Sequence, residues 1–202
     1  RSQPVDAGFR LVGNAPVVQF ALDAAGRFAA FTSKATNLVA GPADSPYYQE
    51  VFLFDRTTGA VTLVTHAAGS ALPVGGHSGQ ATLSADGRFV ALTSYATSLI
   101  PGGTGGNGRQ AQVFLYDRES DSMALVSHAG PDTTNLGSYS PVISADGSHV
   151  AFQSNAPDLL PGLTGCPVQQ GGSYLSNTYV YDRATGGLTL ASHTPGSATT
   201  CS

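Results

Sequence analysis

The sequence predicts an all-β fold, a β-propeller of four-stranded antiparallel blades, with three blades and one extra N-terminal strand in this chain. One segment occurs three times, as LDAAGRFAAFTS, LSADGRFVALTS and ISADGSHVAFQS. A second segment follows each copy, as VFLFDRTTGAVTLVTH, VFLYDRESDSMALVSH and TYVYDRATGGLTLASH. In both segments the residue pattern alternates with the period of a β-strand, and no helical period is present. The repetition and the alternation together indicate stacked β-sheets.

Each repeat contains two predicted hairpins. The tetrapeptides DAAG, SADG and SADG separate the first strand from the second, and their glycines, Gly26, Gly87 and Gly147, are 61 and 60 residues apart. Glycine can take the positive φ that closes such a turn. The stretches DRTTG, DRESD and DRATG separate the third strand from the fourth, and an aspartate there can bond the turn's own amides. Each repeat therefore has four antiparallel strands.

Sheets of this kind cannot bury both faces alone, so they stack radially. We place the blades at residues 17–66, 79–128 and 140–193, with a C-terminal tail at 194–202. Residues 8–14 (GFRLVGN) resemble the fourth-strand pattern, which makes them the last strand of a preceding blade. Three blades are fewer than the roughly four to eight of most propellers, so exposed apolar faces are expected at the open ends. Either the chain is an excerpt of a longer propeller, or copies associate through these open edges as a homo-oligomer.

Composition excludes two classes of partner. With 9 Lys and Arg against 13 Asp and Glu, the net charge of −4 leaves no basic field for a nucleic acid. No apolar run approaches the ~18 residues of a membrane helix, so we expect no membrane insertion. One lysine, 25 glycines and two cysteines suit an extracytoplasmic protein, whether secreted, periplasmic or on the cell surface.

The two cysteines are Cys166 and Cys201. Cys166 lies in the predicted loop between the second and third strands of the last blade, and Cys201 lies beyond its fourth strand, so both belong on one face. A disulfide between them would span 35 residues and stabilise the fold by roughly 3 to 4 kcal/mol. The alternative is two unpaired thiols.

The SADG turn, the VAF-S strand and the VYDR-TG hairpin resemble the TolB-like, WD-like family of propellers over nearly the whole chain. The resemblance implies an extracytoplasmic binding or scaffold module, sometimes appended to an enzyme. Many relatives carry an acidic loop after the second strand that resembles a calcium site. In this chain only the first copy of that loop offers carboxylates, Asp44 and Glu50, so we expect no cofactor, with calcium at these two residues as the alternative.

Three histidines occupy one equivalent position, immediately after the fourth strand of each repeat. The strand order places them on the same face as the variable loops, so this loop-rich face is the predicted binding surface. Its candidate residues are Tyr47, Tyr48, His66, His128, Tyr174 and His193. Equivalent positions in adjacent blades are too far apart to share a metal, so we predict no metal site there. The alternative role of the histidines is turn capping or blade packing.

No catalytic residues are predicted. The segment GHSGQ at 76–80 lacks the last glycine of a nucleophile elbow, and no nucleotide or zinc-protease motif is present. The predicted function is a non-catalytic extracytoplasmic binding or structural module that recognises a protein or a glycan. The alternative is an enzyme accessory domain or a carbohydrate-active enzyme with carboxylates such as Asp44, Glu50 and Asp158, two of which would have to lie about 5 to 9.5 Å apart.

Overall fold

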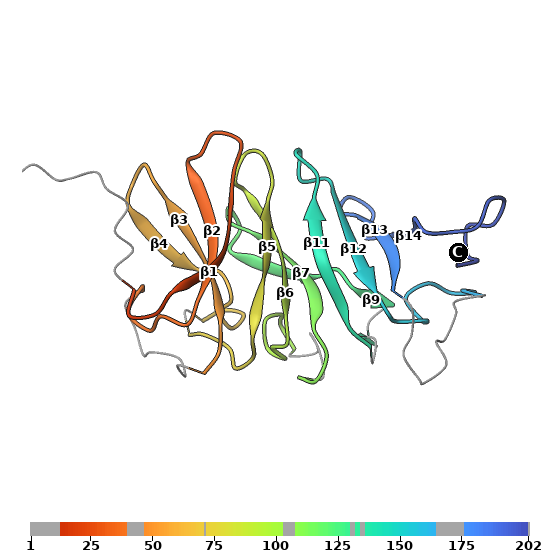
Figure 1. Ribbon diagram of the computed structural model, residues 1–202, viewed down its shortest axis with the longest axis horizontal. Helices are drawn as coiled ribbons and strands as arrows, with labels where there is room; N and C mark the ends of the chain where they lie inside the picture. The colour runs from red at the N-terminus through yellow and green to blue at the C-terminus, as the bar shows by residue number, and fades with distance from the viewer. Residues whose placement is uncertain are drawn as a thin grey trace, which may run out of the picture.

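The computed structural model describes residues 13–39, 47–70, 72–102, 108–129, 132–133, 136–164 and 176–201. These residues form three four-stranded antiparallel sheets, and in each sheet the strands lie side by side in chain order (Figure 1). The predicted all-β class and the four antiparallel strands of each repeat are confirmed. The described residues contain no helix that is long and apolar enough to cross a membrane.

The strand bounds follow the repeats. The first sheet contains β1 (Val17–Leu22), β2 (Phe28–Ser33), β3 (Glu50–Asp55) and β4 (Ala60–Leu63). The second sheet contains β5 (Ser78–Leu83), β6 (Phe89–Ser94), β7 (Gln112–Asp117) and β8 (Ser122–Leu125). The third sheet contains β11 (Ser138–Ile143), β12 (His149–Ser154), β13 (Asn177–Asp182) and β14 (Leu188–Leu190). A short antiparallel pair, β9 (His128–Ala129) and β10 (Asp132–Thr133), lies between the second and third sheets in the chain.

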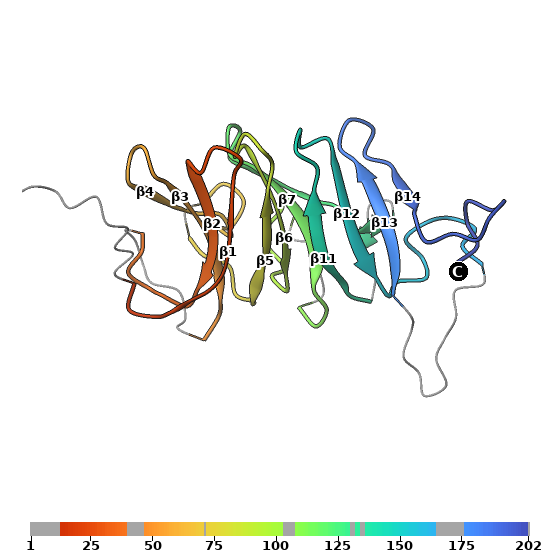
Figure 2. The ribbon, with the colours of Figure 1, turned by 45° about the horizontal axis from the view of Figure 1, so that its top comes forward.

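The three sheets stack in chain order from one end of the molecule to the other (Figures 1 and 2). The first strand of a sheet packs against the sheet before it, because β5 contacts β1, β2 and β3, and β11 contacts β5, β6 and β7. Each sheet therefore has a front face, which points toward the preceding position in the stack, and a rear face, which points toward the following one.

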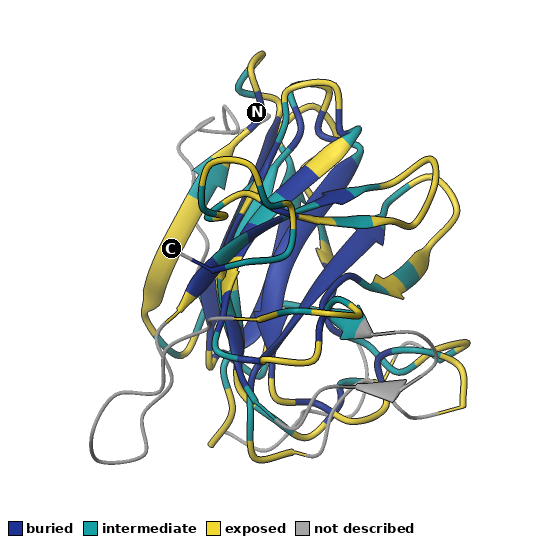
Figure 3. Ribbon diagram, turned by 90° about the vertical axis from the view of Figure 1, so that its right-hand side faces the viewer, coloured by how far each residue is buried: buried dark blue, intermediate teal, exposed yellow. Residues whose placement is uncertain are grey.

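The core lies between the faces of adjacent sheets. Phe28, Ala30 and Leu53 on the rear face of the first sheet pack against Leu92 and Phe114 on the front face of the second. The second and third sheets repeat this arrangement, with a cluster that includes Phe89, Ala91, Leu115, Val150, Phe152 and Tyr179. Viewed from the third-sheet end, buried residues occupy the middle of the stack and exposed residues the rim and loops (Figure 3). Apolar burial between sheets thus supplies most of the driving force for the stack.

The turn between the first and second strands is held by its own side chains. Gly87 and Gly147 have φ values of 67° and 70°, as the sequence predicted for this turn. The Ser84 hydroxyl and the Arg88 amide donate to Asp86, and these bonds lower the pKa of its carboxyl. Asp117, in the second kind of turn, has a lowered pKa mainly because Arg88 donates to it. The ionised carboxylates are therefore part of the folded structure.

These pKa shifts predict acid sensitivity. Because each carboxyl has a lower pKa in the folded chain than in the unfolded one, the unfolded chain takes up protons first as the pH falls. The stabilisation is full above the unfolded aspartate pKa of about 4 and is lost as the pH falls through the folded-state values. We expect equal urea midpoints at pH 7 and pH 5 and a clearly lower one at pH 3. An unchanged midpoint at pH 3 would contradict this role of the turn aspartates.

The predicted extra strand at 8–14 falls mostly outside the described residues. Of it, only Gly13 and Asn14 are described, and they are not in a strand. The Asn14 amide donates to Asn37, and the Asn14 side chain bonds Thr36, so this segment contacts the β2–β3 loop. The assignment of 8–14 to a preceding blade stays a prediction.

Candidate functional site

A polar cluster of three side chains lies where the outer parts of the first and second sheets meet. His66 follows β4 of the first sheet, Tyr116 lies in β7 of the second sheet, and Asp121 lies in the β7–β8 turn. The Tyr116 hydroxyl donates to Asp121 Oδ1 at 2.7 Å, and His66 Nε2 lies 3.1 Å from the same oxygen. The imidazole of His66 meets the ring of Tyr116 edge-on, with centroids 6.2 Å apart. The stacking of two sheets therefore assembles a site that neither sheet contains alone.

The backbone of Asp121 is in an unusual conformation. Its φ is 51°, in the left-handed region, and the equivalent turn positions of the other two sheets are glycines, Gly59 at 73° and Gly186 at 70°. A side chain in this region costs roughly 1 to 2 kcal/mol, although aspartate is better tolerated than most residues. Strain of this kind often accompanies a functional role. The second repeat has replaced the unstrained glycine with a carboxylate.

The environment keeps the Tyr116 phenol neutral and the Asp121 carboxyl ionised. Burial raises the pKa of Tyr116, and its hydrogen bond to Asp121 raises it further. The same hydrogen bond is the main cause of a lowered pKa for Asp121, and His66 adds to the lowering. His66 Nδ1 also lies 3.1 Å from the Ala67 carbonyl oxygen, so both ring nitrogens face hydrogen-bond acceptors. The cluster presents one fixed negative charge next to an imidazole.

The cluster borders a hollow that is open to solvent. The side chain of Asp121 is 67% exposed, whereas that of His66 is 12% exposed. The hollow has a volume of about 510 Å³, which lies within the roughly 300–1,000 Å³ of ligand pockets. We call it the His66–Asp121 groove; its lining residues are Val39, Val61, Thr62, Leu63, His66, Gly69, Ser70 and Asp121. The His66–Asp121 groove is thus lined by apolar side chains such as Val39 and by polar side chains such as Asp121.

The histidines predicted to share a binding surface occupy separate positions: His66 and His128 contact tyrosines of the following sheet, whereas His193 lies beside the C-terminal tail. His128 meets Tyr181 of the third sheet edge-on at 6.5 Å, as His66 meets Tyr116. His193 pairs with Cys201 in a β-bridge. Within the described ranges, no three residues among His, Cys, Asp and Glu come together as a group that could hold a metal ion.

The tyrosines of the predicted surface lie elsewhere. Tyr47 is 75% exposed, and Tyr48 contacts His77 with ring centroids 5.4 Å apart. His77 belongs to a second hollow of about 250 Å³ that also includes Tyr95 and Tyr139. Tyr174 lies outside the described residues. Among the described members of the predicted surface, His66 lines the His66–Asp121 groove, while Tyr48 contacts His77 of the second hollow.

The carboxylates named for calcium or catalysis do not form a described pair. Glu50 is buried at the start of β3, where it accepts a hydrogen bond from the Thr65 hydroxyl. The same bond occurs in the other sheets, from Ser127 to Gln112 and from Ser192 to Asn177. This repetition indicates an architectural role for the Glu50 position. Asp158 is exposed in the loop after β12, and Asp44 lies outside the described residues.

Cys201 is 5% exposed and is not a free thiol. Its amide donates to the Thr164 carbonyl at 3.1 Å, and Thr164 pairs with Thr200 in a parallel bridge. The tail thus runs beside the chain two residues before Cys166. Cys166 itself lies outside the described residues, so the Cys166–Cys201 disulfide stays a prediction.

Comparison with known proteins identifies the fold. No family model and no curated protein matches the chain. Among solved structures, a TolB from Agrobacterium tumefaciens is 15% identical with a TM-score of 0.51, over 87% of this chain and 48% of that one. The β-propeller domain of the Trilobed protease from Pyrococcus furiosus is 12% identical with a TM-score of 0.50, over 86% and 41%. An oligogalacturonate lyase in complex with manganese is 12% identical with a TM-score of 0.51, over 87% and 41%.

The chain therefore has a TolB-like β-propeller fold and spans less than half the length of these structures. The structural similarity shows the fold. Because the sequence identities are low, the activity has to be argued from this chain's own residues.

Sequence reasoning missed Tyr116 and Asp121. A signal for Asp121 was present, because the turn DRESD ends in aspartate where DRTTG and DRATG end in glycine. A departure from glycine at a position that has positive φ in the other repeats distinguishes this turn from the equivalent ones. Tyr116 offered no comparable signal, since an aromatic residue in a strand is ordinarily part of the core.

Proposed function

We propose that this chain is a non-catalytic binding module that works outside the cytoplasm and recognises a carbohydrate in the His66–Asp121 groove. The observation that carries the proposal is the strained backbone of Asp121, at a turn position that is glycine in both other sheets. Glycine would adopt this conformation at no steric cost, whereas aspartate adds an exposed carboxylate that can bind a ligand. The strained turn therefore carries an exposed carboxylate at the edge of the groove.

The groove has the chemistry that a sugar ring requires. Asp121 can accept hydrogen bonds from sugar hydroxyls, and charge-assisted bonds of this kind are about twice as strong as neutral ones. Thr62 and Ser70 add hydroxyl groups, while Val39 and Val61 offer an apolar wall to the C–H face of a ring. Ligand sites commonly combine an apolar lining with a few fixed polar groups in this way.

An extracytoplasmic location is supported by two features of the chain. The composition has one lysine and a low charged fraction of 11%. The Thr164–Thr200 bridge brings the C-terminal tail close to the segment that contains Cys166, as the proposed disulfide requires. Disulfides persist in oxidising compartments and are rare in the cytosol.

The experiment is a carbohydrate screen followed by calorimetric titration of the best ligand with wild type, Asp121→Asn and Glu119→Gln. Asparagine tolerates positive φ and keeps an acceptor, so Asp121→Asn removes the charge with little change to the turn. We expect affinity to fall about 10-fold or more, since the loss of a charged hydrogen bond costs roughly 1.5–3 kcal/mol. Glu119→Gln is the matched control, because Glu119 lies in the same turn, bonded to Arg88, and does not line the groove.

Two results would overturn the proposal. Equal affinity of the wild type and Asp121→Asn would show that the sugar binds elsewhere. Turnover of the bound sugar, measured by product release, would make the chain an enzyme. Titrations with calcium and with a chelator also decide whether the calcium named from the sequence takes part in binding.

A further inference from the structure

The sheets of this chain are joined by the same contact at both junctions. Phe28 on the rear face of the first sheet lies under Arg118 of the second sheet, with the guanidinium carbon 4.5 Å from the ring centroid. Its ring occupies the space where a side chain on Gly87 would be, since a Cβ there would lie 2.3 Å from a ring atom. At the second junction Phe89 lies in the same way under Arg183 and Gly147. We call this contact the phenylalanine joint.

The receiving half of the joint has a fixed structure. Arg118 donates from Nε to the Gly87 carbonyl at 3.2 Å, and Arg183 donates to the Gly147 carbonyl at 2.8 Å. This bond holds the guanidinium beside the glycine turn, above the ring that the preceding sheet supplies. The joint thus consists of a phenylalanine from one sheet and a glycine–arginine pair from the next.

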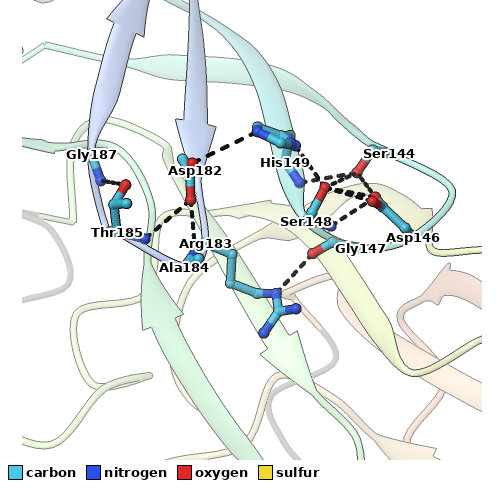
Figure 4. A network of polar contacts seen from close by, with 10 residues as sticks. All are labelled: Ser144, Asp146, Gly147, Ser148, His149, Asp182, Arg183, Ala184, Thr185 and Gly187. Carbon is cyan, nitrogen blue, oxygen red and sulfur yellow. Dashed lines mark hydrogen bonds and ion pairs between the residues drawn. The ribbon is translucent and has the colours of Figure 1, made fainter.

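The third sheet lacks the donating half. His149 occupies the position of Phe28 and Phe89, and its imidazole lies beside Asp182 at 3.8 Å, while Arg183 points to Gly147 (Figure 4). The side chain of His149 is 51% exposed. Gln153 and Thr178 likewise replace a threonine and a valine that are buried in the other two sheets. At these three positions the rear face of the third sheet is therefore more polar than the rear faces of the other two sheets, although Val142, Ala151 and Val180 lie on the same face.

The first sheet, by contrast, carries an empty receiving half. Arg56 donates from Nε to the Gly26 carbonyl at 2.9 Å, the same bond as in the other two sheets. A Cβ on Gly26 would meet no atom within 4 Å, and within the described part of the chain no aromatic ring lies under Arg56. We call this glycine–arginine pair the Gly26–Arg56 socket. Its arginine–glycine hydrogen bond is the same as at Gly87–Arg118 and Gly147–Arg183, where a phenylalanine ring fills the space.

The rest of the first sheet's front face is apolar. Phe20 pairs with Phe31 and Phe31 with Phe52, so their side chains form one row on this face. Phe20 is 79% exposed and Leu22 is 61% exposed. Phe31 and Phe52 are buried, so the exposed apolar part of this face lies along β1, and adjacent exposed apolar side chains mark an interaction surface.

We infer that the front face of the first sheet is a docking surface for another four-stranded sheet of this repeat type, whose phenylalanine fills the Gly26–Arg56 socket. The two internal junctions show the interface that would form, and the rear face of the third sheet lacks the phenylalanine that such a joint needs. A second copy of this chain is not the partner, because its rear face presents His149 in place of the phenylalanine. Val61 and Leu63 lie on this front face and also line the His66–Asp121 groove, so a docked sheet would cover part of the apolar wall of that groove.

The test uses a donor variant that restores the missing half of the joint. It carries His149→Phe, Gln153→Thr and Thr178→Val, the residues found in the second sheet, together with Phe20→Asp to block its own front face. We expect wild type and donor to form a 1:1 complex with twice the 20.5 kDa mass of one chain by light scattering. The matched control replaces wild type with its Phe20→Asp variant, which should not bind. Circular dichroism checks that every variant is folded.

A second measurement needs no donor. Wild type should increase the fluorescence of the apolar dye anilinonaphthalene sulfonate, Phe20→Asp should lose most of this increase, and Val142→Asp, at an exposed position of the third sheet, should keep it. The inference is overturned if folded donor and wild type stay separate. It is also overturned if wild type alone forms head-to-tail oligomers, or if the two aspartate variants bind the dye equally.

Discussion

Replacing Phe89 with alanine is expected to lower the free energy of unfolding by about 3–5 kcal/mol, the usual cost of removing a buried aromatic side chain. Phe89 is 4% exposed and lies between the guanidinium groups of Arg88 and Arg183, whose carbons are 4.8 and 4.3 Å from its centroid. The change removes apolar burial and two cation–π contacts at once. Urea unfolding followed by circular dichroism measures the effect.

His149→Ala is the matched control, because His149 occupies the equivalent position in the third sheet. Its side chain is half exposed and touches no following sheet, so the expected change is within about 0.5 kcal/mol. A comparable loss in the two variants would contradict the role of the phenylalanine joint in holding the sheets together.

The second large effect is expected from Gly87→Ala. Alanine at this position must adopt a φ of 67° and place its Cβ 2.3 Å from the ring of Phe28. The positive φ costs roughly 1–2 kcal/mol, and forcing the ring aside adds about 1–3 kcal/mol of overpacking. We therefore expect a total loss of stability of about 2–5 kcal/mol by the same urea measurement.

Gly26→Ala separates the two contributions. Gly26 has nearly the same φ, 62°, in the equivalent turn, but no atom of the described residues lies within 4 Å of the Cβ that alanine would add. This variant should lose only the roughly 1–2 kcal/mol of backbone strain. If both variants lose the same amount, the contact between Phe28 and Gly87 contributes nothing, and the proposed empty socket at Gly26 loses its main support.

The local structure of this protein could be predicted from sequence because it is repeated and periodic. The turns at Gly26, Gly87 and Gly147 need positive φ, and the strands around them alternate with a period of two. Each such signal lies within about ten residues, and three copies of it agree. Antiparallel pairing of the first with the second strand and of the third with the fourth then follows, because short loops join them, whereas longer loops join the second and third strands.

The candidate site could not be predicted in the same way. His66 and Asp121 are 55 residues apart and meet only because two sheets stack with a particular offset. The three histidines looked equivalent in sequence, but the carboxylate that His66 faces comes from the second repeat, whose turn ends in aspartate where the turns of the other two repeats end in glycine. Side-chain grouping between sheets depends on long-range packing, which no local pattern records.

By itself the sequence determined three repeats, their strands and their turns, because backbone φ preferences and alternating burial act over a few residues. Tertiary structure alone decided which side chains meet between sheets, which apolar faces are covered, and where a carboxylate remains exposed. The contrast between Phe89 and His149 shows the reason. Both residues stand at one position of the repeat, but only the stack of sheets places the first in a buried joint and the second at a polar end.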